Sequence, residues 1–303
     1  MIQDMERLCE IYELVKEIGV VDTANRLNLA IGTVERYCRE YNRQLRERQI
    51  ESIQDTSEAK IKLLSETREN KPSSNHDIVG VIGDIHAPFD HPNYVDFCYD
   101  TFKKHGVTRV VAIGDIVDNH AISHHLTETC ALSPEEEYKN TLQHVQKYVE
   151  AFPSLDLCLG NHDNIPLRQV ATLGIPTVFL KSFSSLWNLP DTWNIVEDII
   201  IDNVYYFHGT GSVGKTPAFN RALNNRMSTV QGHAHSAFGV TYHANPLDIV
   251  FGLDTGCGIL KEAYAFEYGK PFPKKPILGC GVVYSSTEAY AVPMGYEYFR
   301  SAK

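Results

Sequence analysis

The feature that most constrains this chain is a series of five short segments in which glycine stands beside aspartate, asparagine or histidine. With 13 His and 20 Gly in 303 residues, chance predicts about 0.04 occurrences of Gly-His-x-His. Several such segments in one chain therefore indicate one shared site. In chain order they are Gly83-Asp84-Ile85-His86, Gly114-Asp115-Ile116-Val117-Asp118, Gly160-Asn161-His162-Asp163, His208-Gly209 and Gly232-His233-Ala234-His235.

Four of the five segments begin where an apolar run ends. These runs, 78–82, 110–113, 155–159 and 204–207, are short and rich in β-branched and aromatic residues, which favours strands. Residues 134–152 carry apolar side chains at the spacing of one helix face, with acidic residues at the start. Alternating strands and helices predict an α/β sandwich, and such folds place reactive residues in loops at strand ends.

The chain divides into three parts by its pattern. Residues 1–50 are helical in pattern, 51–76 are polar and weakly patterned, and 77–303 contain the alternating strands and helices. Pro72 lies within the polar run 69–75 and disfavours helix in the residue before it. We therefore predict a small helical domain over 1–50, a linker over 51–76 and a larger domain over 77–303.

Composition and charge exclude several classes of protein. Acidic residues lie near the N-terminus, where a signal peptide would be basic, and no apolar run approaches the length of a membrane span. We therefore expect a cytoplasmic protein with no membrane partner. The net charge of -10 argues against nonspecific coating of nucleic acid, although it allows local basic faces. The seven cysteines are scattered without a Cys-x-x-Cys pair, which predicts reduced, buried thiols.

The residue types in the five segments favour a metal site. Residues i and i+2 at the end of a strand point to the same side, so Asp84 and His86 can hold one ion together. His233 and His235 have the same spacing. Carboxylates and imidazoles without thiolates suit Mn²⁺, Fe or Zn²⁺, and we expect Mn²⁺ first.

Taken together, the segments resemble those of the calcineurin-like metallophosphoesterase superfamily, over residues 78–260. The resemblance implies a four-layer αββα sandwich, two divalent metal ions and hydrolysis of a phosphoester by attack of a metal-bound hydroxide. Because every ligand type is present, a decayed and inactive copy is disfavoured. The implied ligands are Asp84, His86 and His235 for the first ion, Asn161, His208 and His233 for the second, and Asp115 as the bridge.

The resemblance also assigns roles beside the metal ions. His162 would act as general acid toward the leaving group, and Asp118 would orient it, with a turn or capping role for Asp118 as the alternative. Protein phosphatases of the family have a phosphate-binding Arg after this aspartate, where the chain has Asn119. This departure disfavours phosphoprotein substrates and leaves diesters and other monoesters open. Three histidines downstream are not assigned to the site: His120, His124 and His125.

Residues 209–216, Gly-Thr-Gly-Ser-Val-Gly-Lys-Thr, match a phosphate-loop pattern. Nucleotide hydrolysis is disfavoured because Pro217 follows directly, the remaining chain is too short for a nucleotide domain, and His208 already belongs to the metal segments. A milder alternative is that the loop, or Lys215 in it, contacts the phosphate of a substrate near the metal ions.

The N-terminal segment resembles generic helix-turn-helix domains. Asp22 is expected to cap a helix over 23–27, Asn28 to take a left-handed turn position, and Thr33 to start a second helix. Along that helix arginines recur at spacings of 3, 4 and 3, forming a stripe that suits nucleic-acid phosphates and base edges. A solvated helix face and a helix that docks protein or dimerises are the alternatives. The arginines are Arg36, Arg39, Arg43 and Arg46.

We therefore expect a dimetal hydrolase preceded by a small all-α helix-turn-helix domain. The favoured substrate is a phosphodiester of nucleic acid, because a phosphoesterase domain is joined to a predicted DNA-binding module. The first alternative is a phosphomonoesterase for nucleotides or phosphoproteins. The second is a DNA-binding regulator with a noncatalytic phosphoesterase platform. The resemblance extends to phage and bacterial enzymes, and a phage-encoded chain would act in the host cytoplasm. Endo or exo cleavage and the oligomeric state are left open.

Overall fold

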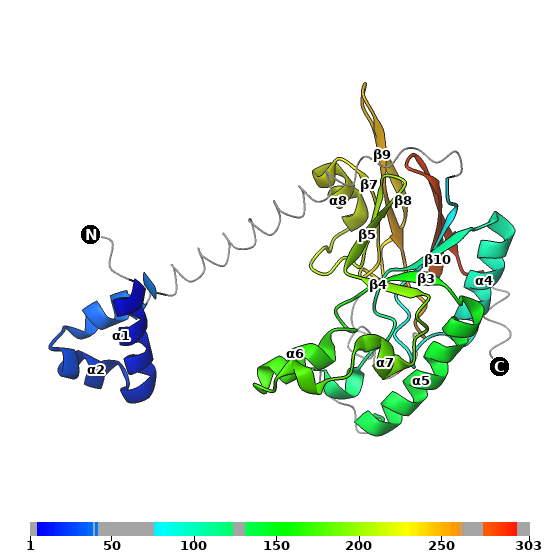
Figure 1. The fold of residues 1–303 in the computed structure, drawn as a ribbon. Helices are drawn as coiled ribbons and strands as arrows, with labels where there is room; N and C mark the ends of the chain where they lie inside the picture. The colour runs from blue at the N-terminus through cyan, green and yellow to red at the C-terminus, as the bar shows by residue number, and fades with distance from the viewer. Residues whose placement is uncertain are drawn as a thin grey trace. The chain divides into compact units, whose positions relative to one another are not determined.

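The computed structural model describes residues 5–38, 40–41, 76–123, 131–260, 263 and 275–295. The chain forms two compact units, Met1–Ser73 and Ser74–Lys303 (Figure 1). Residues 51–75 of the predicted linker lie outside the described part, so the predicted domain limits stay predictions. Among the described helices, none combines the length and apolar character needed to cross a bilayer. The six described cysteines are free.

The N-terminal unit is helical, with α1 at Met5–Ile18, α2 at Val20–Leu27 and a further helical stretch at 31–38. Ile11, Ala24 and Val34 are buried together between them. Asn28 adopts the left-handed conformation predicted for it, with φ 51° and ψ 47°.

Two expected helix starts in this unit are wrong. The helix predicted to follow an Asp22 cap begins earlier, at Val20, after Gly19 turns the chain with φ 85°. Asp22 therefore lies in the first turn, because the glycine allows α2 to begin almost directly after α1. The next helical stretch begins at residue 31 rather than at Thr33.

The second unit contains two sheets and several helices. The described strands form a six-stranded sheet in the order β11-β10-β1-β2-β3-β4 and a five-stranded sheet in the order β5-β6-β7-β9-β8. The strands are β1 Val79–Ile82, β2 Arg109–Ala112, β3 Leu155–Cys158, β4 Trp193–Val196, β5 Asp198–Ile201, β6 Val204–Phe207, β7 Ser228–Gln231, β8 Phe238–Ala244, β9 Ile249–Thr255, β10 Gly279–Ser285 and β11 Glu288–Pro293. The helices are α4 Tyr94–His105, η2 His120–Ile122, α5 Pro134–Ala151, α6 Ile165–Thr172, η3 Thr177–Phe179, α7 Phe183–Trp187 and α8 Pro217–Asn225.

The two sheets pack face to face over a shared apolar core. Val81 of β1 and Val111 of β2 are buried in the same cluster as Val230 of β7 and Leu253 of β9. Central strands such as β1 are buried on both faces, which explains why their sequences are continuous apolar runs. With helices over the outer faces, the unit is an α/β sandwich of the predicted class.

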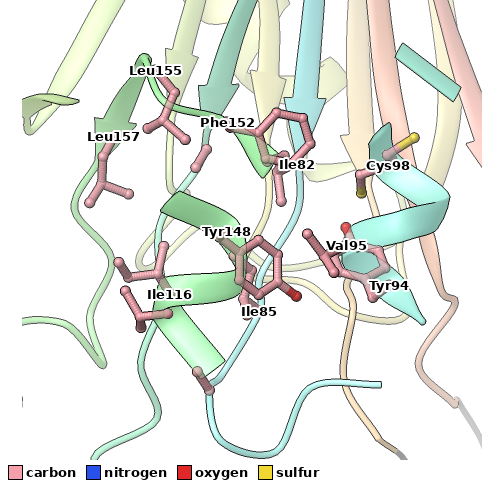
Figure 2. Packing of buried hydrophobic residues seen from close by; sticks show 14 of the residues in the cluster. Ile82, Ile85, Tyr94, Val95, Cys98, Ile116, Tyr148, Phe152, Leu155 and Leu157 are labelled. Carbon is pink, nitrogen blue, oxygen red and sulfur yellow. The ribbon is translucent and has the colours of Figure 1, made fainter. Parts of the chain in front are cut away.

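Helices α4 and α5 cover the outer face of the first sheet (Figure 2). Tyr94 and Cys98 of α4 lie in one buried cluster with Tyr148 of α5 and with Ile82 and Leu157 of the sheet. Helix α5 confirms the helix predicted over 134–152. It begins with a capping box: Ser133 Oγ accepts from Glu136 N, and the Glu136 carboxylate accepts from Ser133 N.

The strand ends of this sandwich carry the five motif segments. Strands β1, β2 and β3 are parallel neighbours, so the first three segments leave the first sheet at one edge. Strands β6 and β7 are likewise parallel, and the last two segments follow them. The buried Tyr94 hydroxyl fixes the first segment, accepting from Gly83 N (3.1 Å) and donating to Gly279 O (2.7 Å).

Candidate metal centre

The strand ends bring the predicted ligands into one cluster. Among the described residues, three overlapping groups of Asp and His side chains each have their ligand atoms within 4.8 Å of one another. Asn161 joins them, because its Oδ1 lies 2.9 Å from His208 Nε2. The three groups are Asp84, His86 and His235; His86, Asp115 and His162; and Asp115, His208 and His233.

The first group directs nitrogen and oxygen atoms toward one point. His86 Nδ1 lies 2.5 Å from Asp118 Oδ1, so this nitrogen carries the proton and His86 Nε2 keeps its lone pair. That lone pair faces His235 Nε2 at 3.1 Å, and His235 Nε2 lies 3.0 Å from Asp84 Oδ2. Asp84 Oδ1 is buried and has no hydrogen-bond partner in the described part of the chain. A cation would satisfy these atoms together.

The second group repeats this arrangement. His208 Nδ1 lies 2.9 Å from the carbonyl oxygen of Ile113, which only an N–H can satisfy, so His208 Nε2 is the ligand nitrogen. This atom faces Asn161 Oδ1 at 2.9 Å, Asp115 Oδ2 at 3.2 Å and His233 Nδ1 at 3.2 Å. Four atoms able to act as acceptors therefore converge in a buried place.

The electrostatics of this group call for a positive charge. Burial would raise the pKa of Asp115, but the charge and hydrogen bond of His208 outweigh it and hold that pKa well below its usual range. Burial would lower the pKa of His208, but Asp115 outweighs it and raises the pKa to about 10. Without a metal ion, a proton on His208 would compensate the carboxylate. A divalent cation would satisfy all four acceptor atoms, so the residue set fits a metal ion.

The local backbone explains the glycines and the tight turns of the motifs. His86, Asp115 and His233 have positive φ angles of 55°, 47° and 62°, a conformation uncommon outside glycine and typical of functional sites. A Cβ on Gly160 would collide with Asp115 Oδ1, and one on Gly232 with Asp84 Oδ1. The motif glycines therefore let two buried carboxylates approach the main chain closely.

Asp118 lies between the metal-ligand cluster and His162. Its Oδ1 contacts His86 Nδ1 at 2.5 Å and His162 Nδ1 at 3.3 Å. Burial would raise the pKa of Asp118, but the hydrogen bonds from these histidines hold it well below its usual range. Burial would lower the pKa of His162, but the hydrogen bond to Asp118 raises it to about 9, so His162 is protonated at neutral pH. The contacts match the orienting role expected of Asp118, and both roles stay predictions.

Three further residues brace the site. The Asp163 carboxylate accepts from Val117 N (3.2 Å) and Gly160 N (2.8 Å), which ties the second motif segment to the third. Asn119, where related protein phosphatases have Arg, donates through Nδ2 to His162 O at 2.9 Å. The Glu137 carboxylate accepts from the main-chain N–H groups of residues 120 and 121. Asp163 belongs to the third motif segment, so the sequence pattern includes it. No sequence pattern indicates a role for Glu137 at the site.

The histidines beyond Asp118 are only partly described. His120 is buried, with Nδ1 3.8 Å from Asp118 Oδ2. His124 and His125 lie outside the described residues. Of the arginine stripe in the N-terminal unit, Arg36 is exposed on the helical stretch 31–38. Arg39, Arg43 and Arg46 lie outside the described part of the chain.

The phosphate-loop pattern leads into α8, but the start of that helix holds a carboxylate. Pro217 offers no N–H, and Ala218 N donates to Asp254 Oδ1 at 3.1 Å. The Asp254 side chain therefore occupies the N–H that a phosphate loop would offer to a phosphate. This geometry supports the sequence argument against nucleotide hydrolysis.

The Asp254 carboxylate predicts a pH dependence of stability. Burial raises its pKa to about 7, partly offset by the bond from Ala218 N. The folded chain thus keeps a proton that the unfolded chain releases at about 3.9, so stability falls as pH rises between these values. Asp254→Asn retains the acceptor and removes the charge. We expect it to flatten this decline and to be more stable than the wild type above pH 7.

Urea unfolding at a series of pH values measures this effect, with the exposed Asp191→Asn as the matched control. If Asp254→Asn and Asp191→Asn gave parallel curves of unfolding free energy against pH, the assignment to Asp254 would be wrong.

Metal binding gives a second prediction. Chelator-treated protein should gain stability on addition of Mn²⁺, by about 2.7 kcal/mol for each site at a concentration one hundred times its Kd. His235→Ala, at a side chain that is 17% exposed, should weaken one site at least about tenfold. The exposed His243→Ala on β8 is the control.

Isothermal titration calorimetry would give the stoichiometry, and thermal unfolding would give the stabilisation. Equal Mn²⁺ binding by the His235→Ala and His243→Ala variants would contradict the ligand assignment.

Known proteins similar to this chain include solved structures and one protein family. Three solved structures are similar at TM-scores of 0.36, 0.35 and 0.31 and identities of 12%, 12% and 10%: Vacuolar Protein Sorting 29 from Cryptosporidium parvum, the phosphoesterase Yfce from E. coli, and a predicted phosphoesterase from Streptococcus pneumoniae TIGR4. They cover 68%, 68% and 70% of this chain, and 83%, 87% and 85% of their own. None of the curated proteins compared with the chain matches it. Residues 78–252, more than half of the chain, match the family described as Calcineurin-like phosphoesterase. The chain therefore belongs to the calcineurin-like phosphoesterase family and is a metal-dependent phosphoesterase.

Proposed function

We propose that this phosphoesterase uses two divalent ions to hydrolyse phosphodiester bonds of nucleic acid. The observation that carries the dimetal part is the convergence of ligand atoms in two groups, one of Asp84, His86 and His235 and the other of Asp115, His208 and His233. Asp115 Oδ2 of the second group lies 3.6 Å from His86 Nε2 of the first. Bound there, the ions would supply an activated water molecule and neutralise charge on the phosphoryl group. Asp84, His86 and His235 would hold one ion, Asn161, His208 and His233 the other.

The donor set supports Mn²⁺ as the first choice. Its atoms are carboxylate oxygens, one amide oxygen and imidazole nitrogens, without a thiolate, which also allows Fe or Zn²⁺. We further propose that the protein acts in the cytoplasm, or in the host cytoplasm if phage-encoded.

His162 is the residue we propose as general acid. Its side chain is 18% exposed, so a substrate can reach it, and its hydrogen bond to Asp118 raises its pKa, which favours the protonated form. Asp118 holds Nδ1, which leaves Nε2–H to donate a proton to the leaving oxygen. A nucleotide alkoxide needs that proton because it is a strong base. Asp118 is thus proposed as the positioning residue for His162.

The residue after Asp118 supports a diester over a phosphoprotein. At neutral pH a phosphodiester carries one negative charge and a phosphomonoester about two, so the monoester gains more from an added cation. At this position the chain has Asn119, whose amide donates to His162 O and adds no charge. The first alternative, a phosphomonoesterase, remains a measurable outcome.

Purified protein with Mn²⁺ should hydrolyse bis-p-nitrophenyl phosphate and labelled DNA faster than p-nitrophenyl phosphate. His162→Ala should lower kcat on DNA by about 10² to 10⁴. It should lower kcat far less on bis-p-nitrophenyl phosphate, because p-nitrophenolate leaves as a stable anion without a proton. His243→Ala should leave both rates at the wild-type level.

Turnover of the monoester without cleavage of either diester would refute the nucleic-acid proposal. Equal losses on both diesters in His162→Ala would remove the general-acid role. No hydrolysis of any ester would favour the second alternative, a DNA-binding regulator with a noncatalytic platform.

We also propose that the N-terminal unit binds DNA. Asn28 is left-handed between two helices, and Ala24 and Val34 are buried in one core, which supports a helix-turn-helix arrangement. Arg36 is exposed beside the ring of Tyr37, 5.6 Å from its centre. The stripe of Arg36, Arg39, Arg43 and Arg46 is the proposed contact with DNA phosphates.

Duplex binding by the full chain, measured by fluorescence anisotropy against salt, tests this proposal. Arg36→Ala/Arg43→Ala should weaken binding and make the slope of log K against log salt shallower by about 0.9 for each lost phosphate contact. Lys16→Ala, at a side chain 59% exposed on α1, is the control. If both proteins bound with the same slope, the arginine stripe would have no role in DNA binding.

A further inference from the structure

A segment beside the metal centre exposes apolar side chains without an explanation in the fold. The α6–η3 segment, residues 165–181, follows the third motif segment directly, and α6 projects from the layered body of its unit (Figure 1). Every residue from 171 to 179 is exposed. Val178 and Phe179 expose 82% and 77% of their surface. Exposed apolar runs of this kind mark binding surfaces.

The charge of this region is opposite to that of the chain as a whole. The chain has 38 acidic and 28 basic residues, yet residues 164–190 contain no Asp or Glu. Arg168 and Lys181 in this stretch are both exposed. Within the described residues Arg168 has no carboxylate partner, so its charge faces solvent. The surface is therefore complementary to a polyanion that also carries apolar or aromatic groups.

Two hydrogen bonds anchor this segment to the site. Arg168 Nη2 donates to the carbonyl oxygen of the candidate ligand Asn161 at 2.8 Å. Gln169 Nε2 donates to the carbonyl oxygen of Ile122, the last residue of η2, at 2.5 Å. A guanidinium has five N–H donors, and the bond to Asn161 uses one of them. The remaining donors of Arg168 therefore lie next to the metal centre and are able to take a phosphate.

We propose that the α6–η3 segment binds single-stranded nucleic acid next to the metal centre, with Arg168 on a backbone phosphate and Phe179 against a base. Exposed aromatic rings and cations are the two elements of single-strand recognition, and stacking on Phe179 requires an unpaired base. This inference deepens the proposed function and rests on it. The inference places Arg168 on a phosphate next to the one that is cleaved. Arg168 therefore does not take the place of the arginine that protein phosphatases of the family have where this chain has Asn119.

A second copy of the chain fits this surface less well. In a two-fold dimer the patch would meet itself, bringing Arg168 and Lys181 toward their own copies with no carboxylate in the stretch to compensate. A polyanion meets no such repulsion.

The test uses the full chain and labelled oligothymidine, with chelator present so that binding is measured without cleavage. Phe179→Ala should weaken binding about tenfold. Arg168→Gln keeps a side-chain N–H for Asn161 O and removes the charge, so the salt dependence should become shallower by about 0.7. The controls are Leu247→Ala, at an exposed apolar loop tip, and Arg226→Gln, at an exposed arginine ending α8. With Mn²⁺, both test variants should lose more turnover on oligothymidine than on bis-p-nitrophenyl phosphate.

The proposal is overturned if wild type does not bind oligothymidine, or if both test variants bind it as the controls do. A dimer that Phe179→Ala converts to monomer in sedimentation would assign the surface to a second copy and overturn it as well. If the wild type hydrolyses no phosphoester but strand binding depends on Arg168 and Phe179, the proposed function fails and this surface stands.

Discussion

Buried carboxylates and imidazole lone pairs that face one another would repel, and the organisation of this site depends on removing that repulsion. His208 Nε2 faces Asp115 and Asn161 at 3.2 Å and 2.9 Å, so either a proton or a metal ion has to lie among them. Main-chain N–H groups satisfy part of the hydrogen-bond acceptor capacity of the two carboxylates. His162 N donates to Asp115 Oδ1, and His233 N donates to Asp84 Oδ2. Asp115 thereby keeps Oδ2 for the cluster, whereas Asp84 Oδ2 accepts from the main chain and also faces His235 Nε2 at 3.0 Å.

This constraint explains why the two sheets have to meet with their strand ends at one place. The ligands come from segments far apart in the chain, and only parallel neighbours such as β1 and β2, or β6 and β7, bring the ends of successive strands to one edge. Packing of the sheets then joins the two sets of ligands, and the close approach of each carboxylate requires a facing glycine. The fold and the metal centre therefore depend on the same buried strands.

The sequence predicts the parts of this site that local patterns encode. Strand ends, motif glycines and ligand types are short-range signals, and the helix over 134–152 has both periodicity and a cap, so these elements agree with the structure. Glu137, which braces residues 120 and 121 from another element, and Arg168, which reaches back to Asn161, act through tertiary contacts that periodicity does not encode. The sequence predicts the start of α2 wrongly. Asp22 is a good capping residue and suggests a start at residue 23, but Gly19 turns the chain earlier and α2 begins at Val20.

The third motif segment links chemistry to substrate binding through single residues. Asn161 turns its side-chain oxygen to the metal-ligand cluster and its carbonyl oxygen to Arg168, while His162 O accepts from Asn119. A strand held by Arg168 would thus be registered against the ligand amide through a single residue, Asn161. Cations on flexible surface loops would not provide this register. The acid-free stretch 164–190 adds local attraction in an otherwise negative protein, so a polyanion would be drawn to the segment that directly follows the proposed acid, His162.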